Sequence, residues 1–132
     1  MAEKEIIAPS GLGEPIGPFV RGIRAGGLVA ISGTSALSHL SGPVESRRMP
    51  EGFEAQARQT FANLEVSLQA AGLGWKDVVK MMVILKRRED YARLNDIRRE
   101  LFSDVPMAST TFIAELLRED MLIEVDVWAV AP

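Results

Sequence analysis

The sequence has no cysteine and a single histidine among its 132 residues. These absences exclude disulfide bonds, a catalytic thiol and the usual zinc sites built from cysteine and histidine. A Ser-His-Asp triad would have to use His39, which lies in a loop rich in serine and glycine where we expect it to be solvated. The residues therefore predict no bound metal.

The chain also lacks a strong excess of charge of one sign and a long apolar run. Its formal net charge is -3, which does not provide the basic surface typical of nucleic-acid binding. The most apolar stretch, 78–85, contains Lys80 and is far shorter than the roughly 20 residues of a membrane-spanning helix. The first residues, MAEKEII, do not resemble a signal peptide. We expect one cytoplasmic domain over 1–132, with no membrane or nucleic-acid partner.

Hydrophobic periodicity along the chain predicts two helices and several strands. Gly26-Gly27 suits a tight hairpin turn, and Gly72 suits the left-handed end of a helix. Segments 9–18 and 34–52 lack a sustained period and are predicted loops. The predicted strands are 3–8, 19–25, 28–32, 78–86, 108–114 and 122–130, and the predicted helices are 53–71 and 91–102.

These elements predict an α+β fold, a two-layer structure in which two helices cover one face of a mixed β-sheet. Strand 78–86 is apolar on both sides and should be an inner strand. In strand 122–130, alternation places Ile123 and Val125 towards the helices and Glu124, Asp126 and Trp128 on the other face. Because that second face is also largely apolar, we expect sheet-to-sheet packing in a homo-oligomer.

Glu124 and Asp126 are the first candidate site, with Cα atoms about 6.6 Å apart by strand rise. Enclosure by a partner would raise a carboxyl pKa towards neutrality, as proton transfer requires. The alternative is that both carboxylates pair with basic residues near a sheet edge. Hydroxyls at 109–111 could hold a carbonyl or carboxylate group, or be ordinary strand residues.

Basic residues are frequent in and before the second helix, where they suggest either a weak RNA-binding patch or a solvated helix surface. They are Lys86, Arg87, Arg88, Arg93, Arg98 and Arg99. Acidic residues are interleaved with them, which favours the solvated surface.

A series of short motifs runs along almost the whole chain. They are Ile16-Gly17-Pro18-Phe19, Ile31-Ser32-Gly33, AQARQT at 55–60 with Asn63-Leu64, AAGL at 70–73, VVK at 78–80, Asn95, and IEVDVWAV at 123–130. In their order and spacing these motifs resemble the RidA/YjgF family. The resemblance implies a chorismate-mutase-like fold, a homotrimer with a central β-barrel, and clefts for a small-molecule ligand at the subunit interfaces. It also implies hydrolysis of enamines or imines to 2-oxo acids and ammonia, without a cofactor.

The resemblance assigns the positioning of water to Glu124, because an imine carbon needs a nearby group that moves protons. It assigns the lining of the cleft to Ser32, Gly33, Asn95 and the backbone of Thr110 and Thr111.

Three positions depart from the family pattern. Ser109 stands where the deaminase subgroup has an arginine that binds the substrate carboxylate, Phe19 replaces a common tyrosine, and Thr111 stands at a position often held by cysteine. A neutral hydroxyl cannot form that ion pair. The sequence therefore does not predict 2-aminoacrylate-type deamination, and it places the chain in a divergent branch.

Three functions remain open from the sequence. The first is a hydrolase or deaminase for small imine, enamine or aminomuconate-like compounds, with Glu124 as acid and base and with Phe19 and Ser109 in the substrate-binding cleft. The second, motivated by the missing arginine, is a trimer that binds a small metabolite without chemistry. The third is an endoribonuclease or translation inhibitor, which the acidic balance of charge argues against.

Overall fold

The computed structural model describes residues 3–132 and contains the two predicted helices and six predicted strands. The strands are β1 (Lys4–Ile7), β2 (Gly22–Ala25), β3 (Leu28–Thr34), β4 (Val78–Leu85), β5 (Ala108–Ile113) and β6 (Ile123–Val130). The helices are α1 (Phe53–Ala70) and α2 (Tyr91–Phe102), with short 3-10 turns at Val44–Ser46, Trp75–Asp77 and Arg88–Asp90. The predicted element types are confirmed.

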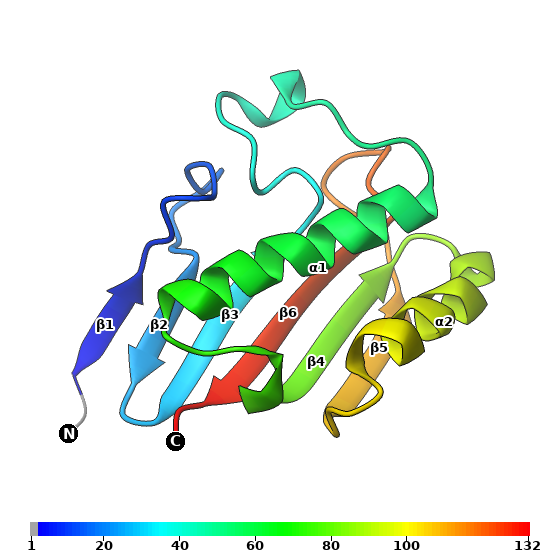
Figure 1. Cartoon of the computed structure of the whole chain (residues 1–132). Coiled ribbons are helices and arrows are strands. Elements are labelled where there is room, and N and C mark those ends of the chain that lie inside the picture. The colour runs from blue at the N-terminus through cyan, green and yellow to red at the C-terminus, as the bar shows by residue number, and fades with distance from the viewer. Residues whose placement is uncertain (1–2) are drawn as a thin grey trace.

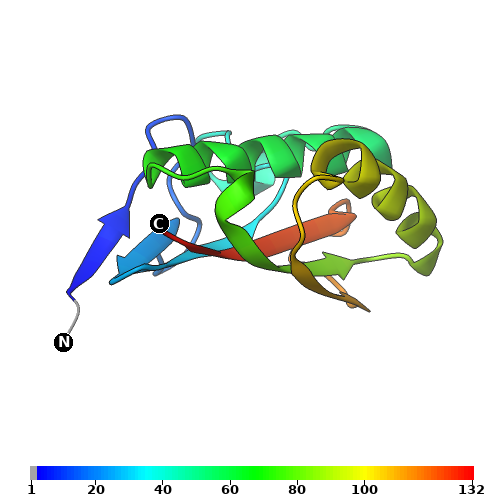
Figure 2. The same ribbon diagram turned by 60° about the horizontal axis from the view of Figure 1, so that its bottom comes forward.

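All six strands form one sheet in the order β1-β2-β3-β6-β4-β5. β4 and β5 are parallel because α2 crosses over between them, and every other neighbouring pair is antiparallel. Both helices lie on one face of this mixed sheet, and within residues 3–132 no second layer covers the other face (Figures 1 and 2). The two-layer α+β prediction is confirmed, and β4 is an inner strand as expected.

The hydrophobic core lies between the helices and the sheet. Side chains from β6 and α1 with the predicted spacings are fully buried there: Val125, Val127, Ala57, Leu64 and Leu68. Trp75, Phe61 and Phe102 form a cluster of three rings, with the Trp75 centroid 6.1 Å from that of Phe61 and 4.4 Å from that of Phe102, and with the two phenylalanine centroids 5.2 Å apart. These contacts join α1 to the end of α2.

Two glycines end elements at the predicted positions. Gly26 has a φ of 60° in the β2–β3 turn, and Gly72 has a φ of 75° after α1. The N–H of Leu73 donates to the carbonyl of Leu68 at 2.9 Å, which satisfies one of the last carbonyls of the helix.

Two predicted strand boundaries are wrong by more than one residue. Residues 19–21 do not belong to β2, which begins at Gly22, because the N–H of Phe19 bonds to the carbonyl of Gly17 and the chain bends there. β3 extends beyond the predicted residue 32 to Thr34, with a shift in its pairing with β6 between Ile31 and Thr34.

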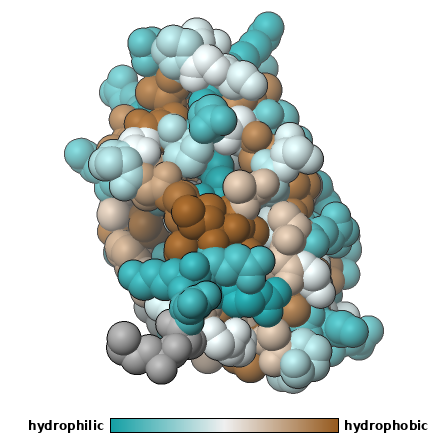
Figure 3. Space-filling view, turned by 90° about the vertical axis from the view of Figure 1, so that its left-hand side faces the viewer, coloured by the Kyte–Doolittle hydropathy of each residue, from teal (hydrophilic) through white to brown (hydrophobic). Residues whose placement is uncertain are grey.

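The sheet face opposite the helices, here called the open face, carries several partly exposed apolar side chains. Alternation and cross-strand pairing place Leu28, Phe112, Trp128 and Val130 on it, each between 42% and 46% exposed. The β1 edge of the sheet also presents an apolar patch framed by hydrophilic surface (Figure 3). Among residues 3–132, no helix combines the length and apolar character needed to cross a bilayer.

Candidate functional site

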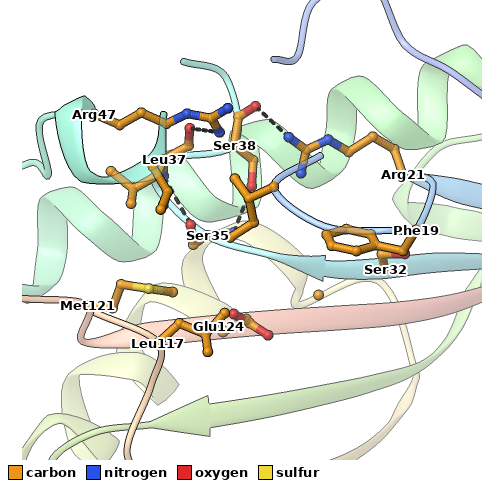
Figure 4. A pocket seen from close by; sticks show the side chains of 13 residues that line it. Phe19, Arg21, Ser32, Ser35, Leu37, Ser38, Arg47, Leu117, Met121 and Glu124 are labelled. Atoms are coloured by element: carbon orange, nitrogen blue, oxygen red, sulfur yellow. Dashed lines mark hydrogen bonds between the residues drawn. The ribbon is translucent and has the colours of Figure 1, made fainter. Parts of the chain in front are cut away.

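A cavity of about 350 Å³ lies between the β3–β6 pair and the loops before β2 and after β3. This volume suits a small ligand. Figure 4 shows Glu124 on the sheet side of the cavity, and Arg21, Arg47 and Ser38 on the loop side. Its walls are formed by the side chains or backbone of Ile16, Phe19, Arg21, Ser32, Gly33, Ser35, Leu37, Ser38, Val44, Arg47, Leu117, Met121 and Glu124.

The irregular pairing of β3 with β6 creates the space for the Glu124 carboxyl group. Ser32 and Gly33 lie in the register shift, and the Ser32 hydroxyl donates to the carbonyl of Val20 at 2.6 Å. A Cβ atom at Gly33 would lie only 2.4 Å from Glu124 Oε1. Glycine at this position is therefore required for the observed placement of the carboxyl group.

Burial raises the pKa of Glu124, and the nearby charge of Asp126 raises it further. Burial also raises the pKa of Asp126, while Lys80 acts in the opposite direction. Asp126 does not line the cavity, and its Oδ1 is buried without a hydrogen-bond partner in the described residues. Both carboxylates lie on β6, an inner strand, and neither forms a salt bridge within residues 3–132. This arrangement fits the proton-transfer hypothesis better than the ion-pair alternative.

Two buried arginines on the loop side of the cavity were missed by the sequence analysis. Arg21 donates to the carbonyls of Gly13 and Ser38 at 2.8 and 3.3 Å, and Arg47 donates to the carbonyls of Gly42 and Glu14, both at 3.1 Å. These bonds tie the two loops together. Burial lowers the pKa of Arg21, and so does the adjacent charge of Arg47, while Glu14 partly offsets both effects.

The structure divides the predicted site residues into separate groups. Four of them, Phe19, Ser32, Gly33 and Glu124, line the cavity described above. Thr110 lies on the open face of β5, where the Lys80 ammonium group donates to its hydroxyl at 2.8 Å.

Asn95, Ser109 and Thr111 lie at the other end of the sheet, between β5 and α2, and border hollows that the cavity does not reach. Because side chains alternate along β5, Ser109 and Thr111 point to the helix side while Thr110 points to the open face. One copy of the chain therefore does not bring Ser109 or Thr111 to Glu124.

Arg98 differs from the expectation of a solvated helix surface. It is half-buried, and its guanidinium group donates to the Ser109 hydroxyl at 2.8 Å and to Asn95 Oδ1 at 2.7 Å. The helix wheel places Arg98 off the apolar stripe, but edge strand β5 lies beside that flank of α2 and covers it. His39, expected to be solvated, is half-buried, and its Nδ1 lies 3.3 Å from the Asn63 amide nitrogen.

No group of three or more His, Cys, Asp or Glu side chains in the described part of the chain is arranged to hold a metal ion. The chemistry available in the cavity is that of one carboxyl group with a raised pKa, the side chains of Arg21 and Arg47, several hydroxyl groups and an apolar wall.

Comparisons with known proteins match the part of the chain that contains all the residues of this site. A family model described as Endoribonuclease L-PSP matches residues 11–131. A RutC family protein of Synechocystis is 39% identical over 121 residues, which are 89% of this chain and 89% of that protein. A 2-iminobutanoate/2-iminopropanoate deaminase of Escherichia coli is 33% identical over 119 residues, 87% of this chain and 88% of the relative. The crystal structure of the YjgF gene product of E. coli has a TM-score of 0.85 at 28% identity, and the match covers 97% of this chain and 99% of that one.

Proposed function

The chain belongs to the RidA/YjgF family, whose family model carries the description Endoribonuclease L-PSP, and on that premise we propose that it is a cofactor-independent deaminase of small imines or enamines. The observation that carries this proposal is the half-buried Glu124 carboxyl group, which faces a cavity of ligand size and has a raised pKa. Relatives named as imine deaminases support the same reaction class.

In the proposed reaction, water adds to the carbon of a protonated imine. Glu124 accepts a proton from the water as the new C–O bond forms, and then gives that proton to the nitrogen of the carbinolamine. As the C–N bond breaks, Glu124, again a carboxylate, accepts the proton of the hydroxyl group and passes it to the departing ammonia. One iminium ion and one water therefore give one 2-oxo acid and one ammonium ion. A raised pKa suits both steps, because it makes the Glu124 carboxylate a stronger base and keeps its protonated form available at a higher pH than an exposed glutamate would.

We propose that the working form is a homotrimer in which the open faces pack into a central barrel. Two observations support this assembly. The first is that the open face carries partly exposed apolar side chains such as Trp128 and Val130. The second is that Ser109 and Glu124 border different hollows of one chain, so a single copy does not bring these two residues together. In the trimer, the β5–α2 edge of one protomer would meet the Glu124 cavity of its neighbour, so that Asn95, Ser109, Thr110 and Thr111 complete a cleft with Phe19, Ser32, Gly33 and Glu124.

The substitution Glu124→Gln tests the catalytic role, because it keeps the shape of the side chain and removes its ability to carry a proton. We expect kcat for ammonia release from 2-iminobutanoate to fall by about 10²- to 10⁴-fold. Glu65→Gln, on the exposed side of α1, is the matched control and should leave kcat unchanged. An unaltered rate in Glu124→Gln would refute the proposed role.

A second candidate function, binding without chemistry, is favoured by the neutral Ser109. Such a binder would gain thermal stability from a ligand that is recovered intact, in the wild type and in Glu124→Gln alike. The endoribonuclease of the family description is disfavoured by the net charge of -3. Cleavage of RNA by a nuclease-free preparation would establish that activity instead.

A further inference from the structure

Arg98 projects from α2 into the groove between this helix and edge strand β5. It borders a hollow of about 570 Å³ together with Tyr91, Ser109, Thr111 and Phe112. On its other side it borders a second hollow of about 350 Å³ that includes Asn95 and Pro106. This one side chain is therefore accessible from two adjoining depressions at the same edge of the molecule.

The neighbouring arginines of α2 have carboxylate partners, whereas Arg98 has none within residues 3–132. Arg93 and Arg99 both reach Asp96, at 3.8 and 3.2 Å. In this part of the chain the hydrogen-bond acceptors of Arg98 are neutral: the Ser109 hydroxyl, Asn95 Oδ1 and the sulfur of Met81. Burial disfavours its charged form and lowers the pKa of Arg98. An anion that binds beside a half-buried guanidinium group without a counter-charge stabilises the charged form of that group.

The hydrogen bonds of Arg98 leave part of its donor fork available. One Nη1–H donates to Ser109 and one Nη2–H donates to Asn95, while Nε–H has no acceptor in the described residues. A carboxylate can bind such a group side-on, through Nε and Nη2, as Asp90 binds Arg87 at 2.9 and 3.0 Å. Ser109 and Asn95 hold the guanidinium plane in one orientation, which reduces the entropy lost on binding.

We infer that Arg98 is the residue that binds the carboxylate group of the ligand, in place of an arginine on β5. This inference rests on the proposed function, because it supplies a cation for a 2-imino or 2-oxo acid. Ser109 and Asn95 are then positioning residues that act through Arg98.

The remaining walls indicate the rest of the ligand. Phe112 and Ile113 are 43% and 42% exposed and border the larger hollow, which suits a short apolar chain next to the carboxylate. Glu89 also borders the larger hollow, and its negative charge would repel a second carboxylate of the ligand. Arg87 lies 4.0 Å from Glu89 and offsets part of that charge. The groove therefore favours a monocarboxylate with a small apolar substituent over a dicarboxylate.

Arg98→Gln and the control Arg99→Gln provide the test. Arg99 is the next residue of the same helix, is 74% exposed and pairs with Asp96. It borders the smaller hollow but not the larger one, which would hold the ligand's apolar substituent, so its loss should affect ligand binding far less than the loss of Arg98. We expect Arg98→Gln to raise KM for 2-iminobutanoate, and Kd for the stable product 2-oxobutanoate, by about 10- to 100-fold. The expected change in kcat is much smaller, since Glu124 still moves the proton. 2-Oxobutanamide, which lacks the charge, should bind the wild type and Arg98→Gln equally.

Thermal unfolding checks that each variant is folded. A second measurement tests the inference on the wild-type protein, in which the Arg98 side chain is present. In an NMR titration of the wild type, 2-oxobutanoate should shift the Nε–H resonance of Arg98, assigned by its absence from Arg98→Lys. No shift, or equal Kd values in Arg98→Gln, Arg99→Gln and the wild type, would overturn the inference while leaving the deaminase intact. Binding of 2-oxobutanoate that depends on Arg98, without ammonia release, would instead refute the proposed reaction and support Arg98.

Discussion

Replacing Gly33 with alanine should reduce catalysis by displacing Glu124 without removing it. The new Cβ atom would lie 2.4 Å from Glu124 Oε1, whereas ordinary van der Waals contacts begin near 3.4 Å. The carboxyl group or β3 must therefore give way by the difference, 1.0 Å. Gly33 is not among the glycines with positive φ, so alanine fits the backbone there.

A displacement of about 1 Å in a group that positions a reactant can cost about 10²-fold in rate. We therefore expect kcat for ammonia release from 2-iminobutanoate to fall by about that factor in Gly33→Ala. The variant should still fold, because the open space of the cavity can accept the displaced side chain.

Gly27→Ala is the matched control, since it lies just before the same strand and its Cβ would be 3.8 Å from the nearest atom, the carbonyl oxygen of Ala131. It should keep the wild-type kcat. A Gly33→Ala protein that is folded and turns over within about twofold of the wild type would show that the position of this carboxyl group does not determine the rate.

Two further predictions concern stability. Burial gives Glu124 a higher pKa in the folded protein than in the unfolded chain, so the folded state binds this proton more tightly. The wild type therefore loses stability as the pH rises from the pKa of the unfolded state through the pKa of the folded state. Thermal unfolding from pH 4 to 9 should therefore show the advantage of Glu124→Gln growing across that window and levelling above it; a constant difference would contradict the assigned cause. Gln56 accepts from the N–H of Leu122 at 2.8 Å and donates to the carbonyl of Asp120 at 2.9 Å, so Gln56→Ala should lower the free energy of unfolding in urea by about 1–3 kcal/mol. The exposed Gln69→Ala should change it by less than about 0.5 kcal/mol, and equal effects would refute the role of those bonds.

The helices, strands and turns were predictable because residue patterns between near neighbours in the sequence indicate them. In β6, apolar and polar residues alternate, and the structure buries Val125 and Val127 while leaving Trp128 on the open face. Gly26 and Gly72 marked a turn and a helix end because few other residues adopt positive φ at low cost. These signals depend only on near neighbours in the sequence.

The composition of the site was predictable only in part, because it depends on contacts between distant segments. Arg21 and Arg47 lie 26 positions apart in the sequence and meet only when two irregular loops fold over β3. The orientation of Ser109 depends on where β5 begins after Pro106, since a shift by one residue exchanges the faces of the strand. Arg98 could have been suspected from its place three residues after Asn95, on the same side of one helix, but its burial requires the position of β5.

The placement of the two tryptophans gives the protein two separate optical probes. Trp75 packs against Phe61 and Phe102 at the junction of the helices, so its fluorescence reports whether the core is intact. Trp128 lies on the opposite side of the sheet and is 42% exposed, so its emission should move to shorter wavelength when another copy excludes water from that face. A dilution series with Trp128→Phe as the reference would separate dissociation from unfolding by the emission wavelength of each tryptophan.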